Sequence, residues 1–198
     1  MDRSRTIKTL AALLAALTVG TFVLLALETR PAQPGSLPPL TALLPRDGAI
    51  LSEIASTAVA VPRDRWRNIV IHDSVCSMDM NPTADCHFVI YGPASGALDG
   101  TVRATPRWHQ QARGNHVSVP GHDYDAVSIG ICLEGDLVAA TPSPRQIEAL
   151  ANLTQALQRR LSIAPERIYL HSDLSGTHCP GRRFPLEAFR SGLLPDEP

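Results

Sequence analysis

The sequence predicts an α/β fold, with a mixed central sheet flanked by helices, for the part of the chain after about residue 60. Short apolar runs bounded by polar residues, such as "RNIVIH" and "AVSIGICLEGD", are typical of buried strands. A long amphipathic helical pattern follows the clearest strand, and one more strand follows that helix. Strands followed by a helix and a further strand favour a largely open sheet with helices on its faces.

Each strand is recognised by an apolar run and by the residues that close it. The first covers Ile69 to Ile71 and ends at His72. The run from Phe88 to Tyr91 is closed by Gly92-Pro93, and a turn at Asp99-Gly100 leads into an edge strand. The predicted strands are therefore 69–71, 88–91, a short strand around Val102, 128–133 and the "RIYL" that leads to His171.

The predicted long helix begins after Ser143, a natural N-cap, with Pro144 at its first position. Gln146 stands three residues after Ser143 and completes a capping box. Apolar residues recur at helical spacing up to Leu161. The closing "FPLEAFRSGLL" is predicted to be a short amphipathic helix.

The N-terminal part is expected to lie outside the globular domain. Basic residues up to Lys8 precede an uncharged run from Thr9 to Leu27, which predicts a signal-anchor over 1–28, or a cleaved signal peptide as the alternative. Residues 29–60 are predicted to be a proline-rich linker and a segment without a clear assignment, and 61–198 the folded domain. The domain is therefore expected on the periplasmic face of the inner membrane, or in the periplasm after cleavage.

Composition excludes some classes of function. The net charge is −1, and no basic stripe suggests a nucleic-acid partner. Lys8 is the only lysine, so the folded domain has no lysine for catalysis. We expect a monomer that contacts the membrane only through its N-terminal segment.

Two histidines and one cysteine predict a metal site. His72 and His171 each follow a short apolar strand, and Cys179 comes eight residues after the second histidine. If the two strands are neighbours, both imidazoles leave the sheet at one edge, and Cys179 folds back toward them. Two imidazoles and a thiolate, with a fourth position open for water, are typical of catalytic zinc. A cysteine nucleophile with a histidine base, and a chance pairing, are the alternatives.

Five segments, in order, resemble the family of type 2 N-acetylmuramoyl-L-alanine amidases and peptidoglycan recognition proteins. The resemblance covers about residues 66 to 190 and rests on "IVIHDS", "CHFVI", "DGTVRATPRWHQQARGNH", "YDAVSIGICLEGD" and "HSDLSGTHCPG". It implies zinc bound by His72, His171 and Cys179. It also implies hydrolysis of the amide between N-acetylmuramic acid and L-alanine in peptidoglycan. A recognition module of the same fold, which binds peptidoglycan with little or no catalysis, is the alternative.

The chain departs from the family where a second catalytic group is usual. Many relatives carry a tyrosine where this chain has Cys86, a glutamate where it has Cys132, or a lysine where it has Thr177. Glu134 is predicted as the replacement base because it stands two residues beyond Cys132, on the same side of the strand. Thr177 is the second catalytic candidate.

The resemblance also implies substrate contacts and a disulfide. The residues expected to line a substrate groove are His87, Arg107, Trp108 and His116. A disulfide between Cys76 and Cys86 is expected, with two free thiols as the alternative. The short stretch between His72 and Cys86 is expected to form a loop or a single turn instead of a full helix.

Overall fold

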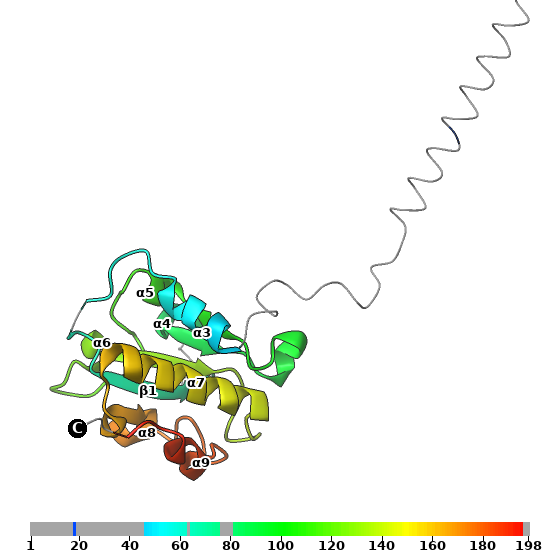
Figure 1. The fold of residues 1–198 in the computed structure, drawn as a ribbon. Helices are drawn as coiled ribbons and strands as arrows, with labels where there is room; N and C mark the ends of the chain where they lie inside the picture. The colour runs from blue at the N-terminus through cyan, green and yellow to red at the C-terminus, as the bar shows by residue number, and fades with distance from the viewer. Residues whose placement is uncertain (1–17, 19–45, 63, 76–80, 196–198) are drawn as a thin grey trace, which may run out of the picture. The chain divides into compact units, whose positions relative to one another are not determined.

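The structure is a computed structural model that describes residue 18 and residues 46–62, 64–75 and 81–195. A five-stranded sheet in the order β3-β2-β4-β1-β5 lies at its centre (Figure 1). β3 is antiparallel to β2, and the other neighbouring strands are parallel. The mixed α/β sheet predicted from the sequence is therefore confirmed. The strands are β1 (Asn68–Asp73), β2 (Phe88–Ile90), β3 (Val102–Ala104), β4 (Ser128–Leu133) and β5 (Ile168–Leu170).

The neighbouring positions of β1 and β5 bring two distant parts of the chain together. The strands pair in parallel, and Ile71 of β1 lies opposite Leu170 of β5. The next residue of each strand is a histidine, His72 and His171. Because the strands run in the same direction, both histidines leave the sheet at the same edge, as the sequence predicts.

Side chains along the strands alternate between the two faces of the sheet. Ile69 and Ile71 of β1 belong to the hydrophobic core, whereas Val70 and His72, also buried, lie outside that cluster. In β4, Ile131 and Leu133 belong to the core, whereas Cys132 does not. His72 and Cys132 lie opposite each other in register and so share the second face.

Helix α7 (Pro144–Leu161) covers the core face of the sheet. Ser143 accepts a hydrogen bond from the Gln146 amide, and the Gln146 side chain accepts one from the Ser143 amide, so the predicted capping box is confirmed. Its buried residues include Leu150, Leu153 and Leu157. The predicted C-terminal helix is present as α9 (Leu186–Ser191).

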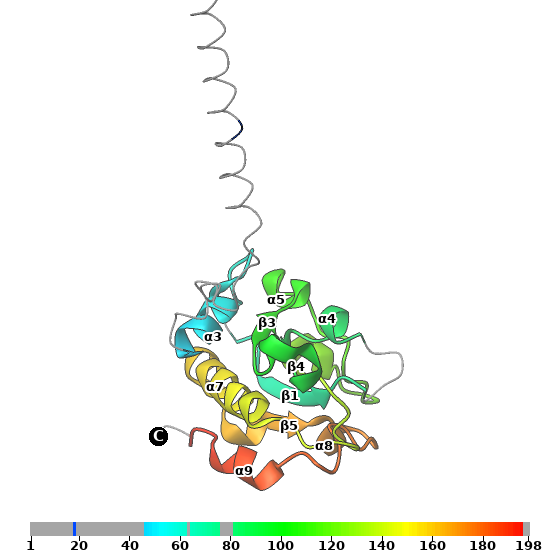
Figure 2. The ribbon, with the colours of Figure 1, turned by 90° about the vertical axis from the view of Figure 1, so that its right-hand side faces the viewer.

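Two short helices lie at the other side of the sheet, where Figure 2 shows α4 (Pro82–Asp85) and α8 (His171–Leu174) across from α3 (Arg46–Ala55) and α7. α4, capped by Asn81, is the single turn predicted between His72 and Cys86. The remaining short segments are η1 (Pro93–Leu98), α5 (Pro106–His109), α6 (Tyr124–Val127) and η2 (Pro165–Arg167).

Helix α3 (Arg46–Ala55) corrects the predicted start of the domain. Ile50 and Ile54 are buried in the core, and the Ile54 carbonyl accepts a hydrogen bond of 3.0 Å from the indole N–H of Trp108. The segment assigned to the 29–60 linker region therefore contributes to the domain. The apolar residues of this short helix show that it belongs to the domain only once α7 and Trp108 lie against them.

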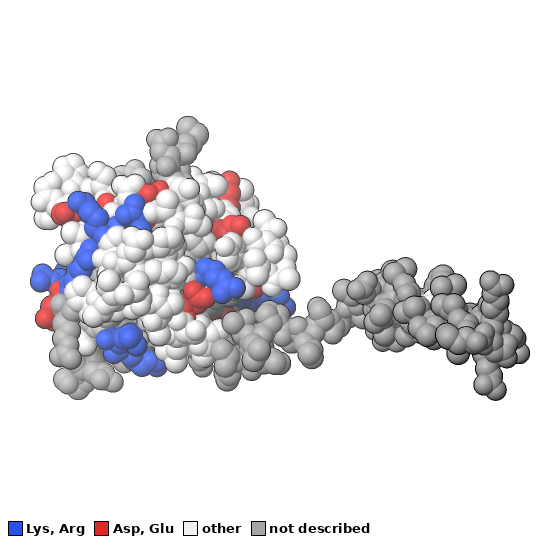
Figure 3. All heavy atoms as spheres, turned by 90° about the horizontal axis from the view of Figure 1, so that it is seen from above, with Lys and Arg blue, Asp and Glu red and all other residues white. Residues whose placement is uncertain are grey.

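The predicted signal-anchor and most of the proline-rich linker lie outside the described residues. Among the helices that are described, none combines the length and the apolar character that a membrane span requires. On the face seen in Figure 3, arginine side chains lie interspersed with Asp and Glu side chains. This part of the surface therefore offers no extended area of a single charge for a polyanion.

Candidate metal centre

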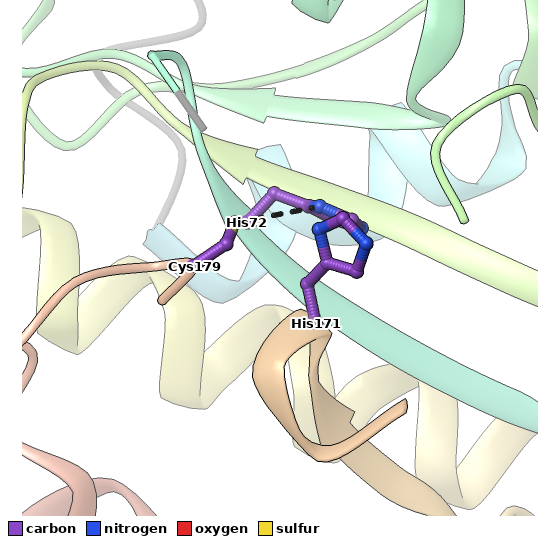
Figure 4. Close-up of side chains that lie close together, drawn as sticks. All are labelled: His72, His171 and Cys179. Atoms are coloured by element: carbon purple, nitrogen blue, oxygen red, sulfur yellow. Dashed lines mark hydrogen bonds between the residues drawn. The ribbon is translucent and has the colours of Figure 1, made fainter. Parts of the chain in front are cut away.

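His72, His171 and Cys179 converge at one edge of the sheet (Figure 4). Each offers a ligand atom, and these atoms all lie within 4.8 Å of one another. The Cys179 Sγ lies 3.7 Å from Nδ1 of His72, and the two imidazole centroids are 4.7 Å apart. All three residues are buried. The spatial prediction made from the two strand ends is confirmed.

The loop after α8 holds Cys179 close to the strand ends. The Ser172 amide donates a 2.9 Å hydrogen bond to the Cys179 carbonyl, which closes the loop on itself. Gly181 has a φ of +108°, and a Cβ atom there would lie 2.5 Å from the Leu137 carbonyl carbon. Only glycine suits this position, because it combines a left-handed backbone with close packing against Leu137.

The environment keeps the imidazoles neutral. Burial lowers the pKa of His72 well below its usual value, and the neighbouring His116 and His171 lower it further. Burial also lowers the pKa of His171. A neutral imidazole has the lone pair that a metal needs. The Nδ1 atom of His171 is buried and has no hydrogen-bond partner within the described residues, so it is available as a ligand.

Cys179 is disulfide-bonded in the structure. A disulfide sulfur has no thiolate charge, whereas zinc binds the thiolate. The three-residue group therefore fits a metal ion only when Cys179 is reduced. No local sequence pattern indicates that the redox state of Cys179 decides whether these three residues can bind a metal ion.

A row of four buried imidazoles crosses the second face of the sheet. Ring centroids are 4.7 Å apart for His171 and His72, 5.0 Å for His72 and His116, and 5.8 Å for His116 and His87. Burial lowers the pKa of both His116 and His87 to about 3. The whole row therefore lacks positive charge near neutral pH.

Comparison with known proteins identifies the family. The family model described as N-acetylmuramoyl-L-alanine amidase matches residues 62–182. The chain belongs to this amidase family. A search of curated proteins finds no significant match.

Several solved amidase structures have the same fold as this chain. The endolysin N-acetylmuramoyl-L-alanine amidase LysCS from Clostridium intestinale URNW is 26% identical, with a TM-score of 0.50 over 64% of this chain and 82% of that chain. The amidase LysC from the same organism is 25% identical, with a TM-score of 0.50 over 69% and 89% of the two chains. AmpDh3 from Pseudomonas aeruginosa, solved with an anhydromuramic pentapeptide, has a TM-score of 0.53 at 20% identity, over 68% and 62%.

Two residues predicted to contact substrate lie in the core of the amidase-family domain instead. Trp108 is 0% exposed, and its indole N–H is bonded to Ile54. His87 is also 0% exposed: its Nδ1 accepts a 3.0 Å hydrogen bond from the Gly130 amide, and its Nε2 lies 3.0 Å from the Ala112 carbonyl. Both ring nitrogens are thus occupied by backbone. The substrate-binding prediction is wrong for Trp108 and His87, because their polar atoms satisfy the buried backbone.

The other two predicted groove residues also bond to protein atoms. Arg107 donates to the carbonyls of Ala84 and Arg113, and its guanidinium lies 3.6 Å from Asp85. His116 is 5% exposed, and its Nδ1 lies 3.1 Å from Nε2 of His72, one of the three candidate metal ligands. Its sequence context, "GNH", carried no signal for this contact.

The two predicted catalytic residues have different surroundings. The Glu134 carboxylate accepts hydrogen bonds from the Gly92 amide at 2.8 Å and from the Ser95 hydroxyl at 2.8 and 2.9 Å. These contacts hold the start of η1. Thr177 is half-buried, and its hydroxyl lies 3.3 Å from that of Ser175. Both catalytic roles stay predictions.

Two buried thiols stand at the positions where the resemblance led us to expect a second catalytic group. Cys86 and Cys132 are free and 0% exposed. A hydrogen bond with Cys86, followed by burial, raises the pKa of the Cys132 thiol well above its usual value. The free Cys86 shows that the predicted Cys76–Cys86 disulfide is wrong. Cys76 itself lies outside the described residues.

Proposed function

We propose that the chain is a zinc-dependent N-acetylmuramoyl-L-alanine amidase that hydrolyses the amide between N-acetylmuramic acid and L-alanine in peptidoglycan. The observation that carries the proposal is the convergence of His72, His171 and Cys179 in a domain of this amidase family. Two nitrogen donors and one sulfur donor match the ligand types that zinc prefers, and three protein ligands leave a fourth position open.

The residues of the chain would hold the zinc ion in a buried setting, with two neutral imidazoles and one thiolate as ligands. Bound zinc lowers the pKa of a water molecule to about 7 and polarises the scissile carbonyl. His72 and His171 would bind as neutral imidazoles, which their lowered pKa values favour. Cys179 would bind as a thiolate, so the metal-binding form is the reduced protein. The sequence predicts Glu134 and Thr177 for the proton transfer that amide cleavage requires. The hydrogen bonds of Glu134 to Gly92 and Ser95 favour a structural role for this carboxylate.

The amidase proposal is tested on purified cell walls with reduced protein. We expect zinc-dependent release of soluble peptide with a new L-alanine amino terminus, loss of release with a chelator, and recovery on adding zinc. His171→Ala should abolish release. His178→Ala is the matched control, because this neighbouring histidine is exposed and lies outside the three-residue group.

A peptidoglycan recognition module is the second candidate. The buried, hydrogen-bonded thiols of Cys86 and Cys132, at positions where relatives carry a tyrosine or a glutamate, favour it. Such a module would sediment with cell walls and release nothing. Zinc-loaded, reduced protein that binds walls without releasing peptide would overturn the amidase proposal in favour of the module.

A further inference from the structure

The ring of His116 lies beside the candidate metal ligand His72, in a space left open by two glycines. The Nδ1 atom of His116 lies 3.1 Å from the Nε2 atom of His72. A Cβ atom on Gly114 or on Gly130 would lie 2.5 Å from the His116 ring. The missing side chains at these two positions therefore leave the space in which the ring is held.

The position of Cys179 indicates which ring nitrogen carries the proton in His72 and, in turn, in His116. Cys179 Sγ lies beside Nδ1 of His72, so Nδ1 is the nitrogen that faces the metal position. A neutral imidazole with an unprotonated Nδ1 carries its proton on Nε2. That N–H then donates to Nδ1 of His116, and neutral His116 must carry its own proton on Nε2.

A carboxylate faces the nitrogen that carries this last proton. Nε2 of His116 makes no hydrogen bond within the described residues, and Oδ1 of Asp125 lies 3.8 Å from it. The Asp125 carboxylate is fixed because Oδ1 accepts hydrogen bonds of 3.0 Å from the amides of both His116 and Val117. The same carboxylate thus orients the backbone and faces the ring of His116.

We propose that His116 is a positioning residue that holds His72 in the tautomer whose Nδ1 faces the metal, with Asp125 behind it. This inference rests on the proposed zinc site. A hydrogen-bonded partner on the second nitrogen of a ligand histidine fixes its ring and increases its basicity, and loss of such a partner lowers metal affinity about 10- to 100-fold.

Three variants of His116 separate positioning from packing. The oxygen of His116→Asn can occupy the place of Nδ1, so this variant should bind zinc within about threefold of wild type. His116→Gln moves the amide one atom further out, and His116→Leu removes the acceptor. Both should lose about 10- to 100-fold in zinc affinity. A purely structural role would not distinguish the asparagine from the glutamine variant.

The measurement is competition for zinc between the reduced protein and a chromophoric chelator, together with the absorption spectrum of the cobalt-substituted protein. His87→Asn is the matched control, since His87 is equally buried but has both ring nitrogens bonded to backbone. It should leave zinc affinity and the cobalt spectrum unchanged.

The outcomes separate this inference from the proposed function. Wild-type protein that binds no zinc when reduced would overturn both. Wild-type protein that binds zinc, with equal affinity in the glutamine and asparagine variants, would overturn only the role of His116. If His116→Leu does not fold, the comparison of asparagine with glutamine decides the question alone.

Discussion

The Sγ atom of Cys179 lies 3.7 Å from Nδ1 of His72, although 107 residues separate them in the sequence. The same sulfur is disulfide-bonded in the structure. This sulfur can therefore either form the disulfide or bind zinc, because a disulfide sulfur cannot bind zinc as a thiolate. The redox state of Cys179 should decide whether this site binds a metal.

The first prediction is that zinc binding requires reduction. Protein treated with a thiol reductant should bind one zinc ion, and oxidised protein should bind far more weakly, as measured by elemental analysis after desalting. Ligand binding to the folded state raises its stability. Zinc should therefore raise the melting temperature of the reduced protein only. Equal zinc content in the two redox states would contradict the assignment of Cys179 as a ligand.

The second prediction concerns the glycine of the "SIGI" strand. In Gly130→Ala the new methyl would lie 2.5 Å from Cδ2 of His116, so the free energy of unfolding should fall by about 1–3 kcal/mol. Urea unfolding measures the change. Gly176→Ala is the matched control, because no atom lies within 4 Å of a Cβ built there.

A double-mutant cycle tests the physical cause of that loss. His116→Ala removes the ring that the new methyl would meet, so the two substitutions together should cost less than the sum of their separate effects. Strict additivity would show that Gly130 is required for another reason.

The third prediction is a pH dependence of stability caused by His87. Burial lowers its pKa to about 3 in the folded protein, from 6.5. Below pH 6.5 the unfolded chain binds a proton that the folded chain does not, so acid favours unfolding. The free energy of unfolding should fall as the pH drops from about 6.5 toward 3, by up to about 1.4 kcal/mol per pH unit for this residue.

His87→Asn isolates that contribution. The asparagine oxygen can still accept the hydrogen bond from the Gly130 amide, but it does not titrate. Urea unfolding between pH 7 and pH 5 should show a shallower loss of stability for this variant. All other side chains are the same in the two proteins, so the difference between the slopes belongs to His87. Parallel slopes would refute the prediction.

The fourth prediction addresses Glu134. If it transfers the proton, Glu134→Gln should lower turnover by about 10²-fold or more and leave the melting temperature nearly unchanged. Its three hydrogen bonds to Gly92 and Ser95 favour the other outcome, a loss of stability with turnover retained. We expect the second result, and Ser95→Ala should then reproduce the loss of stability. Cell-wall release and thermal unfolding, measured on one preparation, distinguish the two.

Sequence patterns alone located the five strands along the chain, the capping box of α7 and the three residues of the candidate metal centre. These features follow from local patterns: short apolar runs bounded by polar residues, a Ser–Gln pair three residues apart, and histidines placed directly after apolar strands. Parallel pairing of β1 with β5 then required His72 and His171 to leave the sheet together.

The folded arrangement of the chain was needed to tell which polar side chains face the candidate metal centre and which form hydrogen bonds within the core. His87 and Trp108 looked like groove residues, but the Gly130 amide and the Ile54 carbonyl occupy their polar atoms. His116 instead meets His72, because Gly114 and Gly130 leave space for its ring. These contacts join residues that are far apart in the sequence. A buried polar atom must find its partner wherever the fold provides one, so no local pattern records it.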